Sequence, residues 1–152
     1  MKTFFTILTA LVAAAAASTL PAEEIIPNGN VTSIETYPNG LPDGLYPGIA
    51  ARDVDLQKRA DSGVYMCNDR NFKGYCVHLT SPFYRCNNLG GDLNDQVSSV
   101  GPDAPHYCFF FSNYNCNDNE GHIGMFSPGA PDLTASNWGF NDKISSWSCN
   151  PS

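Results

Sequence analysis

The stretch Leu93–Val100, with the sequence LNDQVSSV, decides the fold of this chain, because it occurs again as FNDKISSW over Phe140–Trp147. Both copies place an apolar residue before, between and after the polar residues of an Asn-Asp-x-x-Ser-Ser pattern. Both also follow a segment that is rich in cysteine and aromatic residues. A unit that occurs twice, and that is too small to close alone, predicts two motifs that share one core.

Short β-prone runs accompany the two copies after residue 60. No segment there has a sustained helical period, and clusters of Gly, Asn, Asp and Pro separate the runs. Short strands between turn residues predict an all-β protein, either a sandwich or a barrel. The runs are Val64–Cys67, Tyr75–Leu79, Gln96–Val100, Tyr107–Phe111 and Lys143–Trp147.

All six cysteines lie after residue 60, and their number is even. In a small secreted domain this predicts three disulfides, whose pairing the sequence does not choose. A thiolate metal site is disfavoured, because no Cys-x-x-Cys pair occurs. The cysteines are Cys67, Cys76, Cys86, Cys108, Cys116 and Cys149.

The N-terminus is typical of a signal peptide. Lys2 gives a positive start, and a run of apolar residues with two threonines and no charge covers Phe4–Ala17. Small residues follow, so cleavage is expected after Ala17 or as late as Ala22. The run is shorter than the roughly 20 apolar residues of a membrane-spanning helix. Residues 1–17 therefore predict secretion, and no other run is long enough to span a membrane.

Residues 18–59 differ in composition from the rest of the chain. They are rich in proline, glycine and acidic residues and contain no cysteine, which predicts a disordered segment. Asn30 begins an Asn-Val-Thr glycosylation sequon. The dibasic pair Lys58-Arg59 ends the segment and resembles a kexin-type processing site. We therefore expect a pro-peptide over 18–59 and a mature domain over 60–152, with an uncleaved linker as the alternative.

The repeated polar pattern has the chemistry of a calcium clamp. Calcium takes several oxygen ligands, at about 2.3–2.6 Å, from carboxylates, carbonyls, hydroxyls and water. The Asp offers a carboxylate, and a turn after it points the next carbonyl the same way as the first Ser hydroxyl. One turn supplies too few ligands, but two facing copies that exchange carboxylates complete two sites. For a single copy the alternative is an ordinary capped turn, which Asn, Asp and Ser also form.

The pair of clamps resembles the (N/D)(N/D)xx(S/T)S signature of the βγ-crystallin superfamily, which occurs once in each Greek-key motif. The segment Tyr65–Gly74 is similar to the aromatic and Phe-x-Gly corner of that family. The resemblance covers essentially all of Ala60–Ser152 and implies two Greek-key motifs in a small, disulfide-stabilised β-sandwich. In the second motif Cys116-Asn117-Asp118 stands where Phe72-Lys73-Gly74 stands in the first, so a disulfide is expected to replace the aromatic corner.

The resemblance also implies how calcium is held. It implies hydroxyl oxygens from the first serine of each clamp, main-chain carbonyls from the residue after each Asp, and carboxylates that reach the opposite site. Carbonyls from the preceding hairpins would close the two shells. In the same order these residues are Ser98 and Ser145, Gln96 and Lys143, Asp95 and Asp142, and Asn68 and Ser112.

The net charge of −7 gives no electrostatic basis for binding nucleic acid or an anionic membrane, and it suits cations. The spacing of His78, His106 and His122 is not that of a metal site, and no nucleophile motif indicates an enzyme. The sequence therefore predicts a secreted, extracellular, monomeric and non-enzymatic calcium-binding protein. Its further partner would be a target protein or a cell-wall component.

Two alternatives rest on the secreted microbial and fungal proteins that this type resembles. One is a killer-toxin-like or antimicrobial protein or effector, which the pro-peptide favours. The other is a proteinase inhibitor: Leu89–Leu93 is similar to the metalloprotease-inhibitor members, and Ser127–Ser136 is the candidate exposed loop. Trp138 is the candidate partner contact, because aromatic residues are frequent at binding hot spots.

Overall fold

The computed structural model of the chain describes residues 30–45 and 61–152. Eight β-strands and three short 3-10 helices make up this part of the chain, and none of these helices is long and apolar enough to cross a membrane. The strands are β1 (Ser33–Tyr37), β2 (Asp61–Asp69), β3 (Lys73–Pro82), β4 (Asn87–Asn88), β5 (Ser99–Pro102), β6 (Tyr107–Phe111), β7 (His122–Phe126) and β8 (Ser146–Asn150). The 3-10 helices are η2 (Arg70–Phe72), η3 (Gly91–Leu93) and η4 (Tyr114–Cys116).

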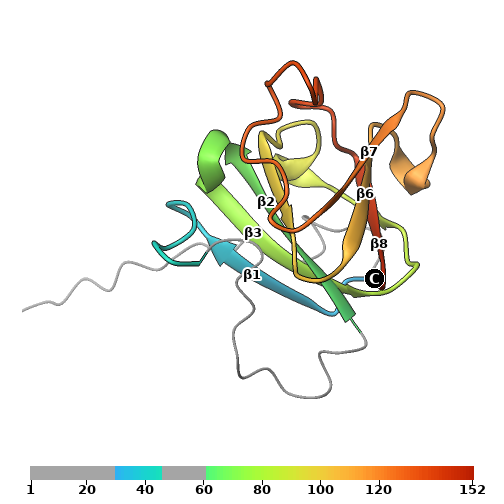
Figure 1. The fold of residues 1–152 in the computed structure, drawn as a ribbon, viewed down its shortest axis with the longest axis horizontal. Coiled ribbons are helices and arrows are strands. Elements are labelled where there is room, and N and C mark those ends of the chain that lie inside the picture. The colour runs from blue at the N-terminus through green and yellow to red at the C-terminus, as the bar shows by residue number, and fades with distance from the viewer. Residues whose placement is uncertain (1–29, 46–60) are drawn as a thin grey trace, which may run out of the picture.

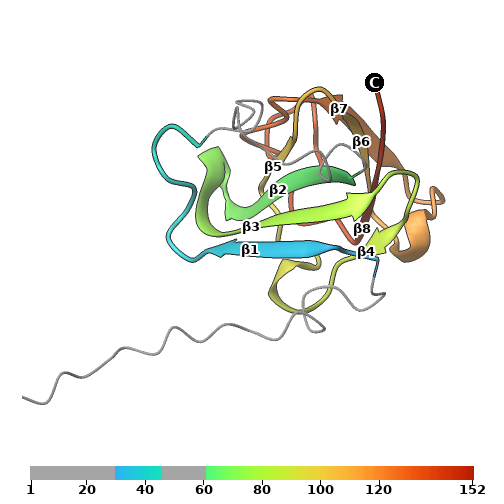
Figure 2. The same ribbon diagram turned by 90° about the horizontal axis from the view of Figure 1, so that it is seen from below.

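The strands form two antiparallel four-stranded sheets that lie in two layers (Figure 1, Figure 2). Sheet A has the strand order β1-β3-β2-β5, and sheet B has the order β4-β8-β6-β7. Two packed antiparallel sheets are the all-β sandwich that the sequence predicts.

The duplication in the sequence organises both sheets. The first unit contributes β3-β2-β5 to sheet A, and the second unit contributes β7-β6-β8, in the same order, to sheet B. Each unit also lends one segment to the other sheet: β4 pairs with β8, and Ala130 forms a bridge with Val100 of β5. This exchange is a Greek-key arrangement, and it joins the two units around one core.

The core lies between the two sheets. Val64 and Met66 of β2 and Phe110 of β6 point into it, since neighbouring residues on a strand alternate between the two faces. The middle apolar residue of each clamp, Val97 or Ile144, is fully buried in the same core. Burial of one such side chain contributes about 1.5–3 kcal/mol. Each clamp is therefore anchored to the core by its middle residue.

Three disulfides join the six cysteines, as the sequence predicts. Cys67–Cys76 links opposite positions of β2 and β3, and Cys108–Cys149 links opposite positions of β6 and β8. Each of these bonds lies within one unit. Cys86–Cys116 links the segment before β4 to η4, and it therefore connects the first unit to the second.

The prediction of disorder over residues 18–59 does not hold for residues 30–45. These contain β1, which pairs antiparallel with β3 along all five of its residues and forms the edge of sheet A. The physical cause is a short alternation within a proline-rich segment, in which Ile34 packs against the main core while its neighbours face solvent. The signal peptide over 1–17 and the processing pair Lys58-Arg59 lie outside the described residues.

Candidate calcium site

Each clamp turns sharply at its aspartate. Asp95 and Asp142 have φ angles of 56° and 52°, in the left-handed region that Asp tolerates better than most residues. The two turns are joined by matching main-chain hydrogen bonds, each 3.1 Å long, from Asp95 N to Ile144 O and from Asp142 N to Val97 O. The clamps therefore face each other at their turns.

The side chains of the two clamps meet across this contact. Ser98 Oγ lies 3.5 Å from Asp142 Oδ1, and Ser145 Oγ lies 3.2 Å from Asp95 Oδ1. Both serines are buried, whereas both aspartates are exposed. Each serine hydroxyl is thus next to the carboxylate of the opposite clamp, within reach of an ion from solvent. The binding of calcium by these groups stays a prediction.

The other carboxylate oxygen of each aspartate is held by the preceding asparagine. Asn94 Nδ2 donates to Asp95 Oδ2 at 2.9 Å, and Asn141 Nδ2 donates to Asp142 Oδ2 at 2.6 Å. In both copies the asparagine Oδ1 is buried and has no hydrogen-bond partner among the described residues. A buried oxygen without a donor calls for an ion or a water beside it. This repeated feature fits a hard cation at the clamps.

The main-chain carbonyls that follow the aspartates are suitable ligands. Within the part of the chain that the structure describes, no hydrogen bond is made to the carbonyl oxygen of Gln96 or Lys143. Their side chains bond to the backbone of their own turns: Gln96 Nε2 donates to Asp95 O at 2.8 Å, and Lys143 Nζ donates to Gly139 O at 2.9 Å. The lysine ammonium thus has its own acceptor beside the second clamp.

Asn68 and Ser112 occupy equivalent places next to the two clamps. Ser98 N donates to the carbonyl of the residue before Asn68, and Ser145 N donates to the carbonyl of the residue before Ser112, both at 2.9 Å. The Asn68 side chain is used inside its own hairpin, where Oδ1 accepts from Tyr75 N at 2.8 Å. The predicted contribution of these two residues is therefore through their main-chain carbonyls.

The second serine of each clamp has a role that sequence reasoning missed. Ser99 Oγ donates to Asp69 O at 2.7 Å and accepts from Phe72 N at 3.2 Å. The hydroxyl thereby ties the corner between β2 and β3 to the start of β5. The sequence signal was present, because both copies carry a pair of serines and the predicted calcium shell uses only the first.

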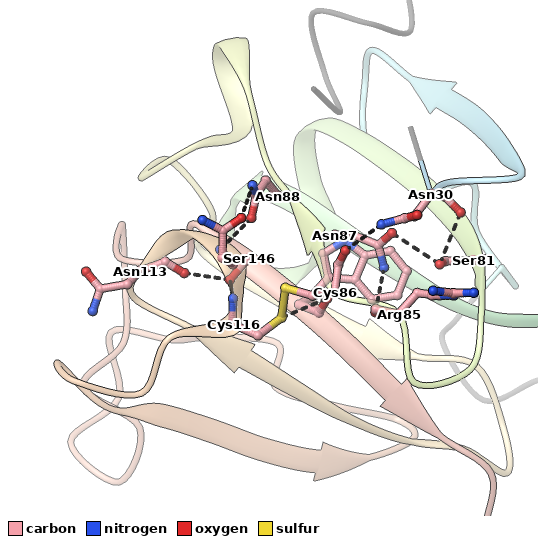
Figure 3. Close-up of a disulfide and its surroundings, with 11 residues drawn as sticks. Asn30, Ser81, Arg85, Cys86, Asn87, Asn88, Asn113, Cys116 and Ser146 are labelled. Carbon is pink, nitrogen blue, oxygen red and sulfur yellow. Dashed lines mark hydrogen bonds between the residues drawn. A yellow bond between two sulfur atoms is a disulfide. The ribbon is translucent and has the colours of Figure 1, made fainter. Parts of the chain in front are cut away.

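Ser146 makes the equivalent bonds at the corner of the second unit. Its hydroxyl donates to Asn113 O at 2.5 Å and accepts from Cys116 N at 2.9 Å (Figure 3). Cys116 stands in the position of Phe72, with a φ of 52° against 55°. Phe72 is anchored by burial, whereas Cys116 is anchored by its disulfide to Cys86. The expectation that a disulfide replaces the aromatic corner is confirmed.

The clamps supply mostly uncharged oxygens. Across residues 30–45 and 61–152, no group of three or more His, Cys, Asp or Glu side chains is arranged to hold a metal ion. His78 pairs with Asp103 at 3.0 Å and His122 with Asp118 at 2.6 Å, each as an isolated pair. A site of one carboxylate, one hydroxyl and main-chain carbonyls suits calcium and not zinc.

The remaining predicted contact residues are only partly accessible. Trp138 is half-buried and packs against the main core. In the stretch Ser127–Ser136, Ala130 and Leu133 are fully buried, and Ala130 forms a bridge with Val100. This stretch is therefore held against sheet A at Ala130, while Pro128, Pro131 and Thr134 are exposed. The inhibitor alternative stays a prediction.

The two Greek-key units, the sandwich they share and the paired clamps define the fold of a βγ-crystallin domain. A solved structure described as "Evolution of the eye lens beta-gamma-crystallin domain fold" is similar to this chain, with a TM-score of 0.50 and 25% sequence identity. The similarity covers 79% of this chain and 99% of that chain. No protein-family model and no curated protein matches the sequence. The resemblance to the βγ-crystallins is thus confirmed for the fold.

Proposed function

We propose that this chain is a secreted, non-enzymatic βγ-crystallin-like protein that binds two calcium ions through its facing clamps. The observation that carries the proposal is the reciprocal contact of Ser98 with Asp142 and of Ser145 with Asp95. Side chains in ordinary capped turns bond to neighbouring backbone. These pairs instead join residues that are 44 and 50 positions apart in the sequence. Such an exchange is expected of two sites that share their ligands.

Each ion would be held by oxygen atoms alone. A hydroxyl and a carbonyl would come from one clamp and a carboxylate from the other, and a hairpin carbonyl and water would complete the six to eight oxygens that calcium takes. One set is Ser98, Gln96, Asp142 and Asn68, and the other is Ser145, Lys143, Asp95 and Ser112.

Calcium would add stability to a domain of modest size. An ion that binds only the folded state contributes about 2.7 kcal/mol when its free concentration is 100 times its Kd. A small core gives little stability by itself, so metal and disulfides would act together. The three disulfides support an extracellular location, because such bonds persist in oxidising compartments.

The test is thermal unfolding of the secreted chain with calcium and with chelator. At saturating calcium we expect the melting temperature to rise by roughly 10 °C or more. Calorimetric titration should give two ions per chain. The double variant Ser98→Ala/Ser145→Ala should lose most of the rise, whereas Ser136→Ala, on an exposed loop, should keep it. A wild-type melting curve that calcium does not move contradicts the proposal.

A further inference from the structure

Among the described residues, β1 is an edge strand that has no counterpart beside β7 of the second unit. The two units correspond strand for strand, β3-β2-β5 with β7-β6-β8. The outer edge of β7 has no partner strand in the described part of the chain, whereas the equivalent edge of β3 carries β1 (Figure 2). β1 also belongs to the segment that precedes the predicted processing pair Lys58-Arg59. The edge of β3 is thus covered by a segment from outside the duplicated domain.

The start of this segment is fastened to the domain by hydrogen bonds. Thr32 N donates to Thr80 O at 2.7 Å, before the five paired positions of β1 and β3. Asn30 Nδ2 donates to Cys86 O at 2.9 Å, and Asn30 O accepts from Ser81 Oγ at 3.3 Å (Figure 3). Asn30 is also the predicted glycosylation site. The Nδ2 atom that donates to Cys86 O is therefore the atom to which a glycan would be attached.

The end of the segment covers an apolar cluster that is separate from the main core. Leu41 is only 7% exposed, and it lies in a cluster with Tyr65, Phe72 and the Cys67–Cys76 disulfide. The ring centroids of Tyr37 and Tyr65 are 6.4 Å apart. These apolar groups of the domain therefore depend on residues 30–45 for part of their cover.

The fit is closest at Gly40. Its φ is +88°, and a Cβ atom there would lie 3.0 Å from both Lys73 Cα and Phe72 O. The next residue, Leu41, donates its main-chain N–H to Phe72 O at 3.0 Å. Only glycine combines this backbone conformation with so close an approach at low cost. The segment and the domain are thus complementary in shape as well as in hydrogen bonding.

We propose that the edge of β3 and the apolar cluster beside it form a binding site for an extended peptide. Its ligand is residues 30–45 of the same chain, which stay bound after the chain is cut at Lys58-Arg59. In strand addition of this kind, main-chain bonds give affinity and pockets for side chains give specificity. The bound strand covers a sheet edge that would otherwise promote aggregation. The apolar cluster adjoins the first clamp through the hydrogen bond from Phe72 N to Ser99 Oγ, but it contains none of the proposed calcium ligands. We therefore expect the peptide to bind with or without calcium.

Cleavage of the secreted chain with a kexin-type endoprotease tests the proposal. Lys58-Arg59 is the one dibasic pair in the sequence, and all six cysteines lie after it, so no disulfide joins the two pieces. We expect the N-terminal piece to co-elute with the domain in gel filtration at micromolar concentration, in calcium and in chelator alike. Elution of the two pieces as separate species overturns the proposal.

A pair of matched variants tests the apolar part of the site. Leu41→Asp should release the N-terminal piece, whereas Asn39→Asp, which adds the same charge at an exposed position, should leave it bound. Should the Leu41→Asp chain not fold, synthetic peptides of residues 30–45 can displace the piece from cleaved wild-type protein. The peptide with Leu41→Asp should compete at least about tenfold less well than the peptide with Asn39→Asp. Equal competition contradicts the proposal.

Discussion

A variant of the second serine of a clamp tests a folding contact without removing any of the proposed calcium ligands. Ser99 is fully buried, and its hydroxyl bonds to the carbonyl of Asp69 and the amide of Phe72. Ser99→Ala removes both bonds at once. Each buried main-chain group that loses a partner costs about 1–3 kcal/mol, and the Asp69 carbonyl is only partly buried. We therefore expect the free energy of unfolding to fall by about 2–3 kcal/mol.

The assay is urea unfolding in the presence of a chelator, where calcium cannot offset the loss. For a domain of this size the same loss lowers the melting temperature by roughly 10–20 °C. Ser98→Ala is the matched control, because the Ser98 hydroxyl contacts the opposite carboxylate at 3.5 Å and ties no corner. It should cost less than about 1 kcal/mol in chelator and act mainly when calcium is present. Equal losses for the two variants in chelator would refute this division of roles.

Two further predictions concern alkaline pH and the bond between the units. Burial, and then the hydrogen bond to Glu35, raises the pKa of Tyr37 from 10.0 to about 12. The unfolded chain loses this proton first, so the stability that Tyr37 gives below pH 10 should be lost as the pH rises to 12. Unfolding free energies across this range measure the loss, and a Tyr37→Phe chain that falls equally steeply contradicts it. The double variant Cys86→Ser/Cys116→Ser opens a link across 30 residues, which should cost about 3–4 kcal/mol in the free energy of unfolding. A cost below about 1 kcal/mol in urea unfolding would show that the corner of the second unit holds without the disulfide.

The features that the sequence determined are those with a local period. The middle residue of each repeated clamp is apolar in both copies, and Val97 and Ile144 are both fully buried just before β5 and β8. The repeated clamp predicted two units. Aligning the two copies also placed Cys116 at the position equivalent to Phe72, which the structure confirms. An even number of cysteines after a predicted signal peptide was enough to predict disulfides.

The tertiary structure decided what depends on residues that are far apart in the chain. The fold determines which cysteines pair. It also places Ser98 next to Asp142 and Ser145 next to Asp95. It also gave the second serine of each clamp its partners and added β1 to the edge of β3. The segment of β1 is rich in proline, glycine and acidic residues, and this composition favours disorder. It is nevertheless ordered, because an edge strand takes much of its stability from the sheet it joins. Local sequence patterns do not contain the surface against which such a segment packs.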